Sequence, residues 1–138
     1  MRMVTVSSIE IDAYSVAAMR GDVLPTCIRL AQTREEKAWH DRLEIVLSVG
    51  PACPRDVLDR ACKLMPHATE PLLLRAAASL RRAAMAKSET QHDTHEENAR
   101  ADLERVMRLD PSDAAARALH PHHGVSSARM SVAPSARL

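Results

Sequence analysis

One segment of this chain occurs twice, and this repeat constrains the fold more than any other feature of the sequence. The segment Asp-Val-Leu-Pro-Thr-Cys-Ile-Arg-Leu-Ala starts at residue 22, and Asp-Val-Leu-Asp-Arg-Ala-Cys-Lys-Leu-Met starts at residue 56, 34 positions later. A period of 34 residues is typical of repeated helical hairpins. Because one hairpin cannot bury its apolar face alone, such hairpins stack on one another. The repeat therefore predicts an all-α fold built from stacked helix pairs.

A third and more divergent copy follows an insertion. It repeats the same spacing of apolar and small residues before a proline: Leu103, Val106, Leu109 and Pro111 correspond to Leu58, Ala61, Leu64 and Pro66. The leucines at 58 and 103 are 45 positions apart, so about one loop has been added between the copies. The polar segment 88–93, within residues 85–98, has no apolar period and is the expected loop.

On this motif the chain resembles the tetratricopeptide-repeat (TPR) family over roughly residues 9–118. It is also similar to uncharacterised bacterial TPR-like proteins that carry a long loop in one hairpin. The resemblance implies an antiparallel helix-hairpin superhelix. The chain departs from the family in lacking most of its aromatic residues, since only Trp39 and Tyr14 are present.

Helix-capping residues, prolines and apolar spacing divide the chain into about six to seven helices. The expected helices cover residues 9–20, 23–32, 33–48, 55–65, 70–87, 94–109 and 114–119. Ser8 and Thr69 are the expected caps of the first and fifth helices, and Thr33 with Glu36 forms a potential capping box for the third. We expect one helical repeat domain over residues 8–119, followed by a disordered tail over residues 120–138.

Composition narrows the class of protein. Aromatic residues make up 1% of the chain, so the core must consist of smaller apolar side chains. The leucines expected in it are Leu58, Leu64, Leu73, Leu80, Leu103 and Leu109. A formal net charge of +1 and the scarcity of aromatic residues argue against a nucleic-acid partner. No signal peptide or membrane span is apparent, and three cysteines do not form a disulfide framework, so a cytoplasmic protein is expected.

Catalytic and metal-binding motifs are weak. His92, His95 and Glu96, with Asp93, could supply metal ligands, but a solvated helix start explains the same residues. The histidines at 120, 122 and 123 could take up a metal adventitiously. Cys53 lies beside a helix start but lacks a neighbouring base that would activate its thiol. With all of these signals weak, no catalytic residue, metal ion or cofactor is assigned.

The fifth expected helix carries a polar stripe of Arg75, Ser79 and Arg82 at helical spacing. In TPR proteins the first helix of each pair lines the concave groove. By this resemblance the groove residues are His40, Glu44, Arg75, Arg81 and Arg82. A cluster of guanidinium groups suits a carboxylate or an acidic peptide, although a plain solvated helix face would carry the same residues.

These observations predict a non-enzymatic protein–protein interaction module that binds an acidic or carboxylate-bearing peptide in its groove. Two alternatives stay open. One is a metal-dependent helical protein that uses residues 92–97, and the other is a degenerate repeat protein that has lost its partner. The sequence determines neither the partner nor the oligomeric state.

Overall fold

The structure is a computed structural model that describes residues 3–6, 9–12 and 23–120. Its packed body is all-α, as predicted, and contains six α-helices in the described residues: α2 (Val23–Glu35), α3 (Trp39–Val49), α4 (Arg55–Leu64), α5 (Glu70–Ala84), α6 (Glu89–Leu109) and α7 (Ala114–Leu119). A short 3-10 helix, η1 (Gly50–Ala52), follows α3. The stacking of helix pairs into a superhelix stays a prediction.

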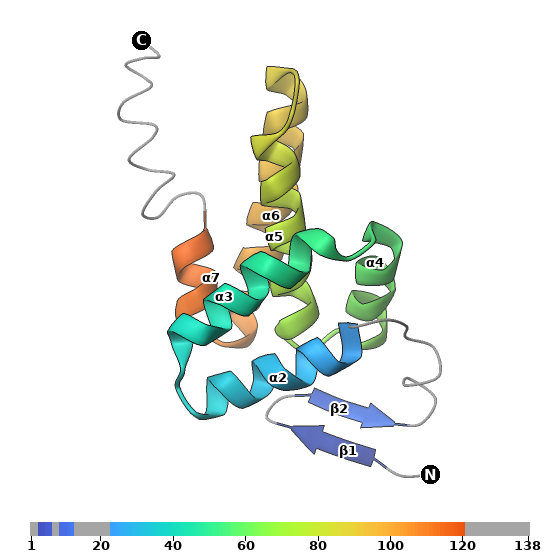
Figure 1. Cartoon of the computed structure of the whole chain (residues 1–138), viewed down its shortest axis with the longest axis vertical. Helices are drawn as coiled ribbons and strands as arrows, with labels where there is room; N and C mark the ends of the chain where they lie inside the picture. Colours follow the sequence, from blue (N-terminus) through green and yellow to red (C-terminus); the bar gives the residue numbers. More distant parts are fainter. Residues whose placement is uncertain (1–2, 7–8, 13–22, 121–138) are drawn as a thin grey trace.

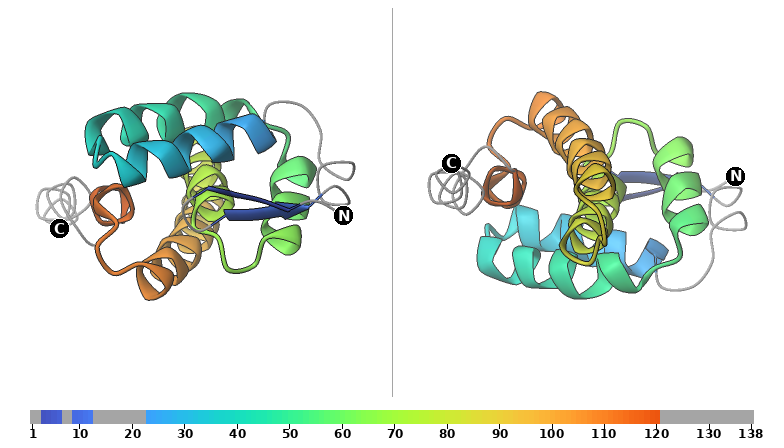
Figure 2. Two further views of the ribbon diagram at one scale, coloured as in Figure 1. Left: turned by 90° about the horizontal axis from the view of Figure 1, so that it is seen from below. Right: turned by 90° about the horizontal axis from the view of Figure 1, so that it is seen from above.

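α5 is the central helix of the body. It packs most extensively along α6, and it also contacts α3, η1 and α4. α2 and α3 form a second pair that crosses α5, while α4 and α7 lie on opposite sides of the molecule (Figures 1 and 2). Leucine and alanine dominate α5, so nearly all of its faces can be buried against neighbouring helices.

The core is aliphatic, as its composition requires. Of the six leucines expected in it, Leu58, Leu73 and Leu103 are fully buried. The other three, Leu64, Leu80 and Leu109, are partly buried and pack against the same cluster. Leu30 and Leu74, which the sequence analysis did not single out, are also fully buried.

The N-terminal end differs from the prediction. A helix was expected over residues 9–20, but β2 (Ile9–Asp12) pairs antiparallel with β1 (Met3–Val6), with Val6 opposite Ile9. The segment Ile9–Asp12 alternates isoleucine with acidic residues, and Val4, Thr5 and Val6 are all β-branched, and both features favour strands over helices. Residues 13–20 of the expected helix lie outside the described residues.

Two further boundaries were wrong. Thr33 of the expected capping box lies inside α2, where its hydroxyl donates to the Leu30 carbonyl at 2.7 Å, and α3 begins only at Trp39. The expected loop over residues 88–93 is mostly helix, since α6 begins at Glu89. There the Ser88 side chain accepts a hydrogen bond from the Gln91 backbone at 3.1 Å and caps the helix.

No helix in the described part of the chain is both long and apolar enough to cross a membrane. The last described element is α7, and His120 follows it. The His120 side chain is buried, and its Nε2 lies 3.2 Å from Glu104 Oε2, so packing continues one residue past the predicted domain boundary. The rest of the predicted tail, residues 121–138, lies outside the described residues.

Candidate functional site

An open pocket of about 500 Å³ lies over α4 and the facing side of α5. Its lining side chains are Asp59, Arg60, Cys62 and Lys63 from α4 and Arg75 from α5. α4 presents them because Leu58 and Ala61 turn into the core, which leaves the residues at positions 59, 60 and 63 exposed. The lining combines three cationic groups with one carboxylate and one thiol.

Arg75 is held rigidly at one side of this pocket. Its Nε and Nη2 donate to the two carboxylate oxygens of Asp102 at 3.0 and 2.9 Å, and its Nη1 donates to Asp59 at 3.0 Å. These two carboxylates keep the pKa of Arg75 well above its ordinary value, chiefly through the hydrogen bonds to Asp102. The guanidinium group is therefore permanently charged and fixed in orientation.

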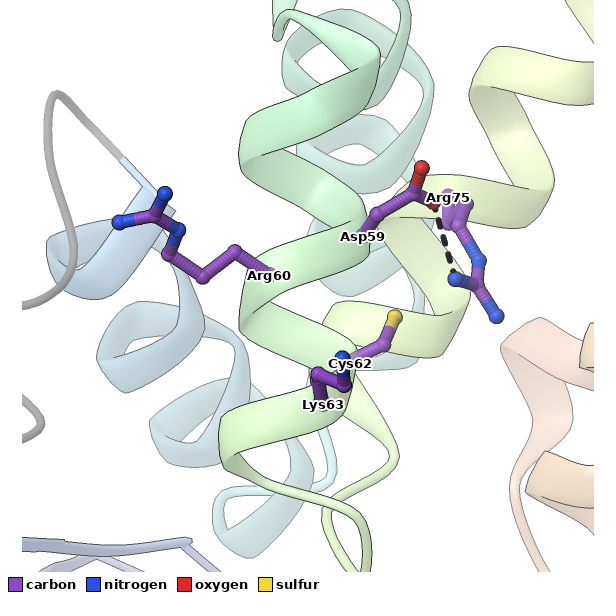
Figure 3. A pocket seen from close by; sticks show the side chains of 5 residues that line it. All are labelled: Asp59, Arg60, Cys62, Lys63 and Arg75. Atoms are coloured by element: carbon purple, nitrogen blue, oxygen red, sulfur yellow. Dashed lines mark hydrogen bonds and ion pairs between the residues drawn. The ribbon is translucent and has the colours of Figure 1, made fainter.

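The close view shows how the lining is divided (Figure 3). Asp59 and the Cys62 thiol point toward Arg75, whereas the Arg60 side chain extends from the opposite side of α4. A ligand that contacted all of these groups would therefore lie across the exposed face of α4.

The Cys62 thiol is an uncharged group in the pocket lining. Burial raises its pKa to about 12, and the nearby Arg75 only partly offsets this effect. The reactive form of cysteine is the thiolate, so Cys62 stays unreactive at neutral pH. Cys27, which is completely buried, has its pKa raised for the same reason.

A second polar feature, the buried charge cluster, is centred on Arg42 of α3. This arginine is fully buried and contacts Glu70 and Asp113, which are fully buried too. Its Nη2 lies 2.9 Å from Asp113 Oδ2, 3.6 Å from Glu70 Oε2 and 3.2 Å from the Thr69 hydroxyl, and its Nη1 donates to the Leu30 carbonyl. The cluster therefore joins α2, α3, the start of α5 and the start of α7. It is enclosed, so it cannot meet a ligand.

The Thr69 side chain binds within this cluster and does not cap α5. It occupies the predicted N-cap position, but its hydroxyl makes no capping hydrogen bond. It accepts from Arg42, and Arg34 Nη1 lies 3.5 Å away. Arg34 also pairs with Asp110 at 3.1 Å, which ties the end of α2 to the end of α6.

The predicted groove residues lie in different surroundings. Arg75 lines the pocket, but its charge is already opposed by two carboxylates. His40 and Glu44 are strongly exposed on α3 and pair with each other at 3.6 Å, away from the pocket lining. Arg81 is exposed and donates to the Met85 sulfur, while Arg82 is half-buried. Ser79 lies between Arg75 and Arg82 on the predicted stripe, and it is buried, so this stripe is not a continuous solvated face.

The segment considered for metal binding forms a compact group. One ligand atom each from His92, Asp93 and Glu96 lies within 4.8 Å of the others. His95 is not part of this group, and its Nδ1 is buried without a hydrogen-bond partner.

Sequence reasoning missed the α4 residues and the buried charge cluster. A usable signal existed for Arg42, which falls at helical spacing with the apolar Ile45 and Val46 and is therefore a charged residue on a core-facing stripe. For α4, the signal was that its apolar and charged residues lie on opposite faces of the helix. No other predicted helix was expected to cover the charged face.

Three comparisons with known proteins were negative, so the site is interpreted from its own chemistry. No family model, no curated protein and no solved structure matches the chain.

Proposed function

We propose that this protein is a non-enzymatic interaction module that binds an acidic or carboxylate-bearing peptide segment across α4. The observation that carries the proposal is the pocket lining, which contains three cationic side chains, Arg60, Lys63 and Arg75, and one carboxylate, Asp59. An anionic segment would be attracted by this excess of positive charge and would form charge-assisted hydrogen bonds with it.

The three cations have different parts in this proposal. Arg75 is a fixed charge whose donors are largely occupied by Asp59 and Asp102, so it contributes mainly electrostatic attraction. Arg60 and Lys63 are exposed on α4, so their charged groups are accessible from solvent. This division moves the proposed site from the TPR-like groove of His40, Glu44, Arg81 and Arg82 to α4 and the adjoining part of α5.

The chemistry of the pocket favours binding over catalysis. A thiol with a pKa of about 12 is a poor nucleophile at neutral pH, and the Asp59 carboxylate is engaged by Arg75. The lining therefore contains no pair of groups arranged as a nucleophile and its base.

A binding titration tests this proposal. The probe is a fluorescein-labelled peptide of six glutamates with a free C-terminal carboxylate, and the readout is fluorescence anisotropy with full-length protein. We expect saturable binding that weakens as salt rises from 20 to 500 mM, because exposed charges are screened over about 8–10 Å near physiological ionic strength.

Two variants locate that binding. Lys63→Ala and Arg60→Ala should each weaken it several-fold, whereas Arg29→Ala should not. Arg29 is an exposed arginine of α2 outside the pocket lining, so its replacement makes the same change in net charge. Equal weakening by Arg29→Ala would show non-specific attraction and would contradict the proposed site, as would the absence of binding by the unmodified protein.

A further inference from the structure

A group of potential metal ligands lies in the first turns of α6, at the end where the α5–α6 pair projects beyond the other helices (Figure 1). We propose that His92, Asp93 and Glu96 bind a divalent transition-metal ion, with Zn²⁺ as the reference case. This site is separate from the pocket on α4, and the proposal does not depend on peptide binding.

The helix itself brings the three ligands together. His92 and Glu96 are four residues apart, and Asp93 and Glu96 are three apart, so both pairs are neighbours on the helix surface. The His92 Nδ1 and Asp93 Oδ1 atoms are 3.3 Å apart. Two ligand atoms at about 2.1 Å from one zinc ion have this separation when the angle between them is about 100°, close to a tetrahedral arrangement.

The third ligand requires only a small movement. All three ligand atoms lie within 4.8 Å of one another, and two atoms bound to the same zinc ion can be at most about 4.2 Å apart. His92 Nδ1 and Asp93 Oδ1 are already closer than this limit, so the remaining adjustment falls to Glu96, whose side chain has three rotatable bonds.

The ligand chemistry indicates the class of metal. Imidazole favours zinc and neighbouring transition metals over Mg²⁺ and Ca²⁺, which prefer sites made entirely of oxygen ligands. The two carboxylates would balance the two positive charges of the ion. Three protein ligands would leave a coordination position for water, so the ion would be bound at an open site.

The chain provides a matched control on α3. His40 and Glu44 have the same four-residue spacing, with His40 Nε2 3.6 Å from Glu44 Oε2, and both are strongly exposed. This pair is not part of any group of three potential ligands found among the described residues. It therefore tests whether a histidine–glutamate pair alone is sufficient.

The experiment is a Zn²⁺ titration by isothermal calorimetry of untagged, full-length protein. Every sample carries His122→Ala and His123→Ala, so that the C-terminal histidines cannot supply the signal. In this background we expect one saturable site. The Zn²⁺ affinity should fall by roughly tenfold or more in each of three variants, His92→Ala, Asp93→Asn and Glu96→Gln. Removing a residue that only supports a metal ligand already costs about this much affinity. His40→Ala should leave the affinity unchanged.

A second measurement locates the ion independently. Zn²⁺ should shift the backbone amide NMR signals of residues 88–97 and leave those of α3 in place, with the helical circular dichroism of each variant confirming its fold. The proposal is overturned if the reference protein shows no saturable binding. Binding that survives His92→Ala, or that weakens equally in His40→Ala, would also overturn it.

Discussion

Arg42 shows at the level of a single residue why this small aliphatic core contains charges. Its side chain is completely buried, yet it contacts two carboxylates, a hydroxyl and a backbone carbonyl from three other parts of the chain. Its ring neighbour Trp39 lies 5.9 Å from the guanidinium carbon, at a distance suited to a cation–π interaction. The polar contacts of Arg42 join α2 and α3 to the starts of α5 and α7.

The first prediction concerns this residue. Arg42→Met should lower the free energy of unfolding by about 3–5 kcal/mol, because it leaves the buried carboxylates of Glu70 and Asp113 without a compensating charge. Urea denaturation measures the change. Arg29→Ala, at an exposed position of α2, should stay within about 0.5 kcal/mol of the unmodified protein.

A rescue experiment separates charge from shape at Arg42. Adding Glu70→Gln and Asp113→Asn to Arg42→Met should recover part of the lost stability, since the uncompensated carboxylates are then removed. If the triple variant is less stable than Arg42→Met alone, the buried charge cluster does not have the electrostatic role described here.

A second prediction follows from Asp110. Partial burial alone would raise the pKa of this carboxyl group, but hydrogen bonds from Ser112 and the ion pair with Arg34 outweigh it and lower the pKa below its ordinary value. Stability from such a group is complete above roughly pH 4 and is lost as the pH falls through the lowered pKa of the folded state.

Asp110→Asn should therefore destabilise the protein at pH 7, and its difference from the unmodified protein should shrink as the pH falls below about 4. Urea unfolding at pH 7, 5 and 3 measures this dependence. Asp41→Asn, an exposed position on α3, serves as the control and should differ little from the unmodified protein. A difference for Asp110→Asn that stays constant across this range would contradict the proposed ion pair.

At the level of elements, α6 shows how a local signal was misread. Residues 88–93 were interpreted as a loop because they are polar and lack an apolar period. Their sequence Ser-Glu-Thr-Gln nevertheless matches the capping-box pattern, and Gln91 Oε1 accepts from the Lys87 backbone while Ser88 accepts from Gln91. An exposed helix end needs no apolar period, so capping was the more informative signal here.

A third prediction tests this cap. Ser88→Ala should cost about 1 kcal/mol, because the Gln91 N–H loses its side-chain acceptor. Thr90→Ala, an exposed change within the same turn, makes a suitable control and should have a smaller effect. Thermal unfolding of both variants provides the comparison, and equal melting temperatures would argue against a capping role for Ser88.

The contact between η1 and α5 gives a fourth prediction. A Cβ atom added at Gly50 would lie 2.6 Å from the Leu74 carbonyl oxygen and 3.0 Å from the Ala77 Cβ, so the backbones would have to separate. Gly50→Ala should cost about 1–3 kcal/mol through overpacking. Ala52→Ser, an exposed change in the same turn, should be nearly neutral in urea denaturation. A neutral Gly50→Ala would mean that these segments are farther apart than described.

For the whole molecule, the repeat and the caps predicted where helices begin and which leucines are buried. They did not predict the contacts between distant segments. The starts of α2, α4, α5 and α7 and the fully buried Leu58, Leu73 and Leu103 followed from spacing, prolines and apolar periodicity. The N-terminal strands did not, because each is only four residues long and only Ile9–Asp12 alternates apolar and polar residues.

The candidate site was less accessible to prediction, for a physical reason. Arg75 was identified from its helix, but its partners Asp59 and Asp102 belong to two other helices, and no local pattern links them. Resemblance to TPR proteins directed attention to His40, Glu44, Arg81 and Arg82, whereas the pocket lies over α4. Packing of α4 beside α5 created it, and this packing is a property of the folded chain.

The central claim is that α4 and Arg75 form the binding surface, and NMR mapping tests it most directly. Unlabelled hexaglutamate peptide is added to full-length ¹⁵N-labelled protein, and the backbone amide shifts are followed. The account predicts the largest shifts at residues 59–63 and 75, reduced in Lys63→Ala. Shifts centred on His40 and Glu44 of α3, or spread evenly over all exposed cationic residues, would contradict it.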